Sequence, residues 1–163
     1  MPAPEEATFY TLINTLNETG DSLLGADRKI PFAYYNENGL LMFYVADQKI
    51  ITWCRNKEGA EQWVVKAPPP PYPIMGLNEM ALRPEAKVII VADEKRKECL
   101  SPLLPEVVVI TWFGGDKNIK NTDWRPLSDV SSVLGWPEAS IPGDNAMNKI
   151  SKVVNAIEKD GTG

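Results

Sequence analysis

The sequence contains no histidine, and this absence excludes a whole group of active sites. Without histidine the chain has no Ser-His-Asp triad, no histidine-ligated metal site and no histidine general base. The only two cysteines, Cys54 and Cys99, are too few for a four-thiolate zinc site or a disulfide framework. So low a cysteine content is typical of a reducing cytosol, and we expect a cytoplasmic protein.

Long apolar runs and common catalytic motifs are also missing. No window reaches the roughly 18 apolar residues that a transmembrane helix needs, so we expect no membrane partner. Residues 1–6 are acidic where a signal peptide would be basic. The sequence has no Gly-x-Ser-x-Gly, no Walker A and no Gly-x-Gly-x-x-Gly motif. It therefore indicates neither a serine hydrolase nor a P-loop or dinucleotide-binding protein.

The length and charge suit one small folded protein of acidic character. The 163 residues suffice to bury a core without disulfides or metal. Asp and Glu number 22 and Lys and Arg number 17, which gives a net charge of −5. This excess argues against a general nucleic-acid coat protein, although it leaves room for a local basic patch.

Residues 1–66 predict a helix followed by an antiparallel β region. Phe9, Leu12, Ile13 and Leu16 share one helical face. Asn38-Gly39 favours a hairpin turn, because both residues tolerate a positive φ. Asn56-Lys57-Glu58-Gly59 predicts a second turn. The runs between the turns predict four strands of a meander, over residues 30–35, 40–46, 49–55 and 61–66.

Residues 67–76 are rich in proline. Proline donates no backbone hydrogen bond, so we expect Ala67 to Pro73 to be an extended connector that ends all regular pairing. Pro69-Pro70-Pro71-Tyr72 also matches the short motif that WW domains bind. The sequence leaves both readings open, a stiff spacer and a peptide ligand.

Residues 77–163 predict strands that alternate with helices. Strands are expected at 87–91, 107–112 and 129–136, and helices at 77–82 and 93–100, the second with Cys99 packed inside. Asp144 is the expected N-cap of a last helix, whose apolar face comprises Met147, Ile150, Val153, Val154 and Ile157. The fold class is therefore α/β, a small parallel-sheet domain preceded by an antiparallel meander.

Ligands of an open parallel sheet bind at the carboxyl ends of its strands. That rule selects three loops, 92–95, 113–117 and 137–140. Their carboxylates are hard oxygen ligands that suit Mg²⁺, namely those of Asp93, Glu94, Asp116 and Glu138. The alternative is that Asp93 and Glu94 only complement the dipole of the helix they precede.

The same loops carry a candidate site for single-stranded nucleic acid. Gly114 and Gly115 allow the backbone to approach a phosphate, or form a plain turn. Trp112 and Trp124 are candidates to stack on bases. The candidate phosphate contacts are Lys95, Lys97, Lys117, Lys120 and Arg125. Because Glu98, Asp116 and Asp123 are interspersed, a solvated face of mixed charge is the alternative.

Several segments together resemble the Toprim domain of phage- and plasmid-type DNA primases and primase–helicases. The likeness extends over roughly residues 31–154, including the hairpin at 35–41. It is carried by Pro73-Ile74-Met75-Gly76-Leu77-Asn78, Val88-Ile89-Ile90-Val91-Ala92-Asp93-Glu94-Lys95, Thr111-Trp112-Phe113-Gly114-Gly115, Asp123-Trp124-Arg125-Pro126-Leu127 and Gly135-Trp136-Pro137-Glu138-Ala139-Ser140. The resemblance implies a compact α/β fold.

The resemblance also implies a damaged catalytic centre. The family's Glu-Gly-Glu-Lys motif reads Ala92-Asp93-Glu94-Lys95 here, so Glu94 and Lys95 match and the first glutamate is lost. The family's Trp-Pro-Asp-x-Asp motif retains Glu138 in place of the first aspartate, and Ser140 replaces the second. Phosphoryl transfer with two metal ions needs several carboxylates. We therefore expect no cofactor, with Mg²⁺ held by Asp93, Glu94 and Glu138 only if activity persists.

Three functions follow from these patterns. The first is a catalytically degenerate Toprim-like protein of a mobile element that binds single-stranded nucleic acid or a replication protein. The second is an inhibitor or effector that binds a protein partner. The third is a weakly active Mg²⁺-dependent primase or nuclease. Salt separates the first two, because binding to nucleic acid weakens steeply as salt rises.

Overall fold

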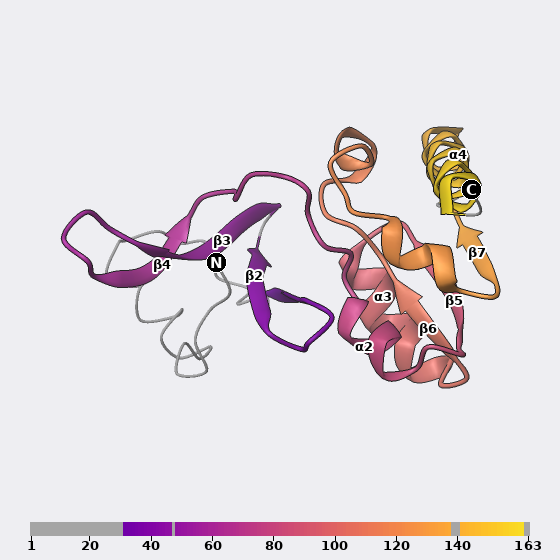
Figure 1. Ribbon diagram of the computed structural model, residues 1–163, viewed down its shortest axis with the longest axis horizontal. Coiled ribbons are helices and arrows are strands. Elements are labelled where there is room, and N and C mark those ends of the chain that lie inside the picture. The colour runs from indigo at the N-terminus through magenta and orange to yellow at the C-terminus, as the bar shows by residue number, and fades with distance from the viewer. Residues whose placement is uncertain (1–30, 47, 138–140, 162–163) are drawn as a thin grey trace. The chain divides into compact units, whose positions relative to one another are not determined.

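The computed structural model describes residues 31–46, 48–137 and 141–161 (Figure 1). The chain divides into two compact units, Met1–Pro69 and Pro70–Gly163. Both units contain a β-sheet, and the second also contains the helices described below, so the expected α/β class is confirmed at that level. The predicted helix over residues 9–16 lies outside the described residues.

The first unit contains a four-stranded antiparallel sheet in the order β1-β2-β3-β4. The strands are β1 (Phe32–Tyr35), β2 (Leu41–Ala46), β3 (Lys49–Arg55) and β4 (Glu61–Val65). They confirm the predicted meander, with bounds that differ by two residues at most. Aromatic and β-branched side chains favour strands because they pack well on a pleated surface. Tyr34 and Phe43 face each other across β1 and β2 with stacked rings 4.7 Å apart.

The turn between β1 and β2 is built on Asn36 and Gly39. The Gly39 N–H donates to the Asn36 carbonyl at 3.0 Å, and the Asn36 Oδ1 accepts from the backbone N–H of Leu40 at 2.9 Å. Gly39 has a φ of +78°, whereas Asn38 does not take a positive φ. The predicted hairpin turn is confirmed, and the side chain of Asn36 closes it with only Gly39 of the Asn-Gly pair in the left-handed region.

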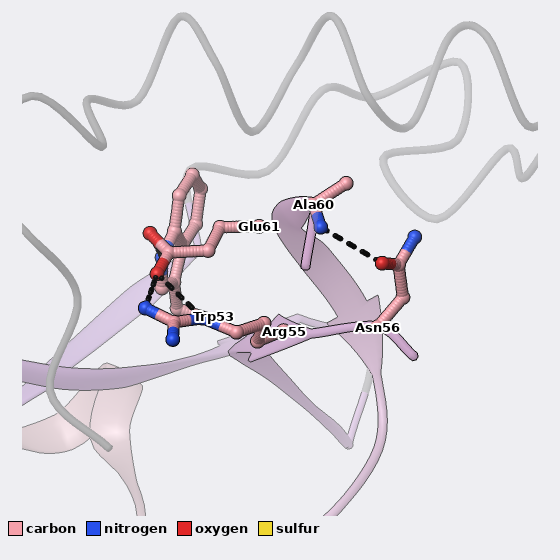
Figure 2. Close-up of polar contacts among 5 residues, drawn as sticks. All are labelled: Trp53, Arg55, Asn56, Ala60 and Glu61. Atoms are coloured by element: carbon pink, nitrogen blue, oxygen red, sulfur yellow. Dashed lines mark hydrogen bonds and ion pairs between the residues drawn. The ribbon is translucent and has the colours of Figure 1, made fainter. Parts of the chain in front are cut away.

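The turn between β3 and β4 repeats this arrangement, as Figure 2 shows. The Asn56 Oδ1 accepts from the backbone N–H of Ala60 at 2.8 Å. Just beyond it, the Glu61 carboxylate accepts from Trp53 Nε1 at 3.2 Å and from Arg55 at 2.5 and 3.1 Å. The hydrogen bonds from Arg55 have the largest effect in lowering the pKa of Glu61, and the hydrogen bond from Trp53 lowers it further. All these contacts lie within one hairpin, and they fix its register.

The proline-rich segment belongs partly to the second unit. Met75 pairs with Thr111 and Tyr72 pairs with Thr122 in isolated β-bridges, and Ile74 is fully buried. The expectation that pairing stops throughout Ala67 to Pro73 was therefore wrong at Tyr72. Tyr72 is 8% exposed, so recognition by a WW domain would require its ring to leave the fold.

The second unit is organised around a three-stranded parallel sheet in the order β6-β5-β7. Its elements in chain order are α2 (Leu77–Leu82), β5 (Lys87–Val91), α3 (Glu94–Leu100), β6 (Val107–Ile110), β7 (Val133–Trp136) and α4 (Ile141–Gly161). The predicted parallel sheet is confirmed. Three of the four apolar residues of β5, Val88, Ile90 and Val91, are buried, as is typical of the central strand of a parallel sheet.

The connection from β6 to β7 differs from the expected strand–helix alternation. It contains two short 3₁₀ helices, η2 (Gly115–Asn118) and η3 (Arg125–Asp129). The third strand consequently begins at Val133 rather than at Asp129. Pro126 near the start of η3 suits the first turn of a helix, where its missing N–H leaves no bond unmade.

The last helix packs its apolar face on the sheet as predicted. Ile150 and Val154 are buried, and Met147 and Val153 pack against the same core. Asp144 lies in the first turn and not at the N-cap, because the helix begins three residues earlier. Cys99, which was expected to be packed, is exposed on α3. Within the described residues, no helix is both long enough and apolar enough to cross a lipid bilayer.

Candidate nucleic-acid interface

The carboxyl ends of the three parallel strands define one edge of the sheet in the second unit. The Thr111 hydroxyl donates to the Val91 carbonyl at 2.8 Å, which ties the chain just after β6 to the end of β5. Trp136, the last residue of β7, pairs with Val91 from the other side. The loops after β5 and β6 therefore leave from the same place, as the strand rule predicts. We call this region the carboxyl edge.

Asp93 caps the helix that follows β5. Its Oδ1 accepts a hydrogen bond from the Arg96 backbone N–H at 2.8 Å, and its carboxylate is also paired with the Arg96 guanidinium. This is the structural role that the sequence left as the alternative for Asp93. Glu94 follows in the first helical turn. Ala92, half-buried between β5 and Asp93, has no ligand atom.

The remaining carboxylates do not gather into a metal site in the part of the chain that the structure describes. No group of three or more Asp, Glu or Cys side chains is close enough there to hold an ion. Asp116 accepts from Lys149 Nζ at 2.7 Å, which links η2 to α4. Glu138 and Ser140 lie outside the described residues. We derive no step through a bound Mg²⁺.

Lys97 does not lie at a surface where it could meet a phosphate. Its side chain is 5% exposed, and its Nζ donates to the Glu79 carboxylate at 3.0 and 3.2 Å. A Cβ on Gly76 would lie only 3.2 Å from the Lys97 Cε, so the lysine stem runs along the backbone before α2. The prediction of Lys97 as a phosphate contact was wrong, because this lysine ties α3 to α2.

Trp112 and Trp124 were also predicted wrongly as stacking residues. Each is 2% exposed, and their rings pack together with centroids 5.8 Å apart. Trp112 Nε1 donates to the Gly115 carbonyl at 2.7 Å, and Trp124 Nε1 donates to the Ile119 carbonyl at 2.8 Å. Both indoles belong to the core, where they also satisfy carbonyls of the β6–β7 connection.

Three of the predicted cations remain open to solvent. Lys95 on α3, Lys117 on η2 and Lys120 just after η2 are exposed. Among the described residues, no carboxylate forms an ion pair with any of the three. Their positive charges are therefore available to an anionic ligand.

Arg125 differs from these lysines because it already has a partner. Its Nε and one of its terminal nitrogens donate to the two carboxylate oxygens of Asp123, both at 2.8 Å. The side-chain hydrogen bonds from Arg125 are the main reason why the pKa of Asp123 is lowered. Arg125 thus matches the alternative reading, a solvated face of mixed charge.

The two glycines after β6 have different reasons to be glycine. Both have a positive φ, +83° for Gly114 and +62° for Gly115. A Cβ on Gly114 would lie 1.9 Å from the Asn118 Nδ2, so any side chain there would force Asn118 to shift. Nothing lies within 4 Å of a Cβ on Gly115. Gly115 is therefore the position of the pair where a ligand can approach the backbone.

One residue of the carboxyl edge was missed by reasoning from the sequence. Trp136 is 50% exposed, and Leu134, two positions earlier on the same face of β7, is 59% exposed. Both residues were expected inside a strand of the sheet, and the sequence pattern alone does not distinguish an edge strand from a central one. The only pointer was the position of Trp136 at the end of its strand, in the segment Gly135-Trp136-Pro137.

Comparison with known proteins finds no matching family model and no matching curated protein. The Toprim resemblance therefore rests on the residues of the chain itself, and the functions that it implies remain proposals.

Proposed function

We propose that the second unit is a noncatalytic, Toprim-like domain that binds nucleic acid at its carboxyl edge. The observation that carries this proposal is a set of three exposed lysines that have no carboxylate partner among the described residues, in the segments that follow the adjacent parallel strands β5 and β6. They are Lys95, Lys117 and Lys120. Lysine is a flexible point charge that suits a phosphate group. Such contacts hold a nucleic acid by its backbone and do not distinguish its sequence.

The state of the acidic residues favours binding over catalysis. Ala92 supplies no oxygen at the end of β5, and Asp93 is engaged as an N-cap by Arg96. A phosphoryl-transfer centre needs several free carboxylates to gather its metal ions. The proposal accordingly assigns no bond-breaking step to these residues.

The lysines also predict how the binding depends on salt. Each phosphate contact releases a condensed counterion, and the logarithm of the binding constant falls with the logarithm of salt by about 0.7 per contact for a single strand. Three lysines therefore predict a slope of about −2. A net charge of −5 does not prevent this, because charges far from the edge are screened beyond about 8 Å at physiological salt.

The test is fluorescence anisotropy with a labelled DNA 12-mer, titrated at 25 to 200 mM salt. The variant carries Lys95→Glu, Lys117→Glu and Lys120→Glu together. Its matched control carries Lys→Glu at three exposed lysines of the first unit, residues 49, 57 and 66. The two variants have the same net charge, so only position distinguishes them.

We expect the edge variant to lose binding at 25 mM salt and the control to keep most of it. Equal loss in both variants would show that overall charge and not the carboxyl edge holds the DNA. An absence of binding by the unmodified chain at 25 mM salt would refute the proposal, and a salt-independent protein partner would then be sought.

A further inference from the structure

We propose that the second unit binds a small neutral molecule in a cavity between β7 and α4. The ligand class is a single apolar ring that carries one hydroxyl or amide group. The cavity has a volume of about 180 Å³, and an apolar cavity of about 150 Å³ is enough to hold benzene. None of the described residues that line the cavity is a lysine, so this proposal does not depend on the proposed binding of nucleic acid.

The cavity exists because one face of β7 carries little bulk where α4 covers it. Val133 and Gly135 occupy alternate positions of β7 and therefore lie on the same face of the sheet. A Cβ on Gly135 would lie 3.1 Å from the Met147 Sδ, so α4 packs against this face (Figure 1). Both residues of β7 and Met147 line the cavity. The missing side chain at Gly135 thus leaves open a space that a larger residue would enter.

The inner wall of the cavity is apolar. Ile90 of β5 and Ile150 and Val154 of α4 line it, and each of them is at most 7% exposed. The partly buried Val133 and Met147 pack against the same core. A ring that enters this space removes its own apolar surface from water, which favours binding.

The mouth of the cavity is polar but uncharged. Ser131, Ser151 and Asn155 line it and are exposed to solvent. Ser151 and Asn155 are four positions apart on α4, which places them on one side of the helix. In the part of the chain that the structure describes, none of the three side chains forms a hydrogen bond. Their hydroxyl and amide groups are therefore available to a polar group on the ligand.

The lining also determines the charge of the ligand. No Asp, Glu, Lys or Arg is among the described residues that line the cavity. A charged ligand would lose part of its hydration there without gaining a counterion, which is costly. The cavity is therefore expected to accept a neutral ring and to reject a charged one of similar size.

The experiment is a titration of the ¹⁵N-labelled full chain, followed by amide chemical shifts in NMR spectra. Phenol is the probe, because it combines one ring with one hydroxyl group. Benzene lacks the hydroxyl group, and benzoate replaces it with a negative charge. Ser151→Leu places an apolar side chain at the mouth. Ala156→Leu is the matched control, because Ala156 is exposed on the same helix and does not line the cavity.

We expect phenol to bind with a dissociation constant of about 1 mM, as a ligand of so few atoms permits. Amides of β7 and of residues 147–155 should shift, and amides of β2 and β3 should not. Benzene should bind about fivefold more weakly, because it forms no hydrogen bond at the mouth. Benzoate and Ser151→Leu should each weaken binding by about tenfold or more, whereas Ala156→Leu should change it by less than about twofold.

Three results would overturn the proposal. One is the absence of saturable shifts in the unmodified chain at 10 mM phenol, a result that needs no variant. Another is equal affinity for phenol and benzoate, which would indicate adsorption without a site. The third is unchanged phenol affinity in Ser151→Leu when its circular dichroism melt shows that it is folded. Each of these results leaves the proposed binding of DNA untouched, because that binding is measured separately on the lysine variants.

Discussion

Ile74 provides a sharp test of where the second unit begins. This residue follows the proline run, and the sequence predicted that it belongs to a connector. Its side chain is nevertheless fully buried, with 0% of its surface exposed to solvent. It belongs to the same buried cluster as Leu77, Val88 and Ile110. Replacing it by alanine removes three carbon atoms from that cluster without touching any polar contact.

The expected loss of stability follows from the burial of those atoms. Each buried methyl or methylene group contributes about 0.8 kcal/mol, which gives about 2.4 kcal/mol for three. The cavity left behind adds to this, so Ile74→Ala should lower the free energy of unfolding by roughly 3–4 kcal/mol. For a unit of about 100 residues, such a change lowers the melting temperature by roughly 15–25 °C.

Hydrogen exchange measured by mass spectrometry resolves the two units in the full chain. We expect amides of β5 and β6 to lose protection by about 100-fold or more, since about 1.4 kcal/mol corresponds to a tenfold change. Amides of β2 and β3 should be unaffected. The matched control is Leu82→Ala, because Leu82 is 83% exposed and its loss should change protection little.

The reasoning would be refuted by a loss of less than tenfold in β5 and β6. It would also be refuted if Leu82→Ala had an effect as large as Ile74→Ala. Either result would mean that the segment before α2 is a connector, as its proline content suggested.

Three further predictions concern the carboxyl edge and its surroundings. Lys97→Met should leave DNA affinity within about twofold in anisotropy titrations, because the buried ammonium meets a carboxylate and no phosphate. Gly114→Ala should destabilise the chain by about 2–3 kcal/mol in urea unfolding and Gly115→Ala by about 1 kcal/mol, since both residues have a positive φ but only the first Cβ meets a side chain. Arg125 lowers the pKa of Asp123 below 3.8, so this pair stabilises the fold above that pH and the stabilisation is lost as pH falls through the folded pKa. The difference in melting temperature between the unmodified chain and Arg125→Ala should accordingly be present at pH 7 and shrink below pH 3.8, and a difference that grows in acid would contradict the assignment.

Much of the local structure was predictable because it depends on neighbours in sequence. The apolar run Lys87–Val91 forms β5 with the expected bounds, and Leu77–Leu82 forms α2 in the same way. The turns at Asn36 and Asn56 form where asparagine and glycine were expected to close hairpins. Asp93 caps α3 through a bond to a residue three positions away.

The candidate site was predictable only in its location. Loops at the ends of parallel strands were expected to meet, and the bond from Thr111 to Val91 shows that two of them do. The roles of the individual residues in those loops were predicted less well. The charge or aromatic ring of a side chain does not indicate whether that side chain is buried in the core. Lys97 and Trp124 are both buried, and each found a partner in another element or turn, Glu79 and Ile119 respectively.

The sequence by itself determined which short segments become strands, helices and turns, because backbone preference and hydrophobic periodicity act over a few residues. Tertiary structure decided which of these segments cover one another. It drew Ile74 into the second core and buried two tryptophans in the β6–β7 connection. It also left β7 at an edge with Trp136 half exposed. Burial depends on contacts between residues far apart in the chain, and a pattern read along the sequence does not contain those contacts.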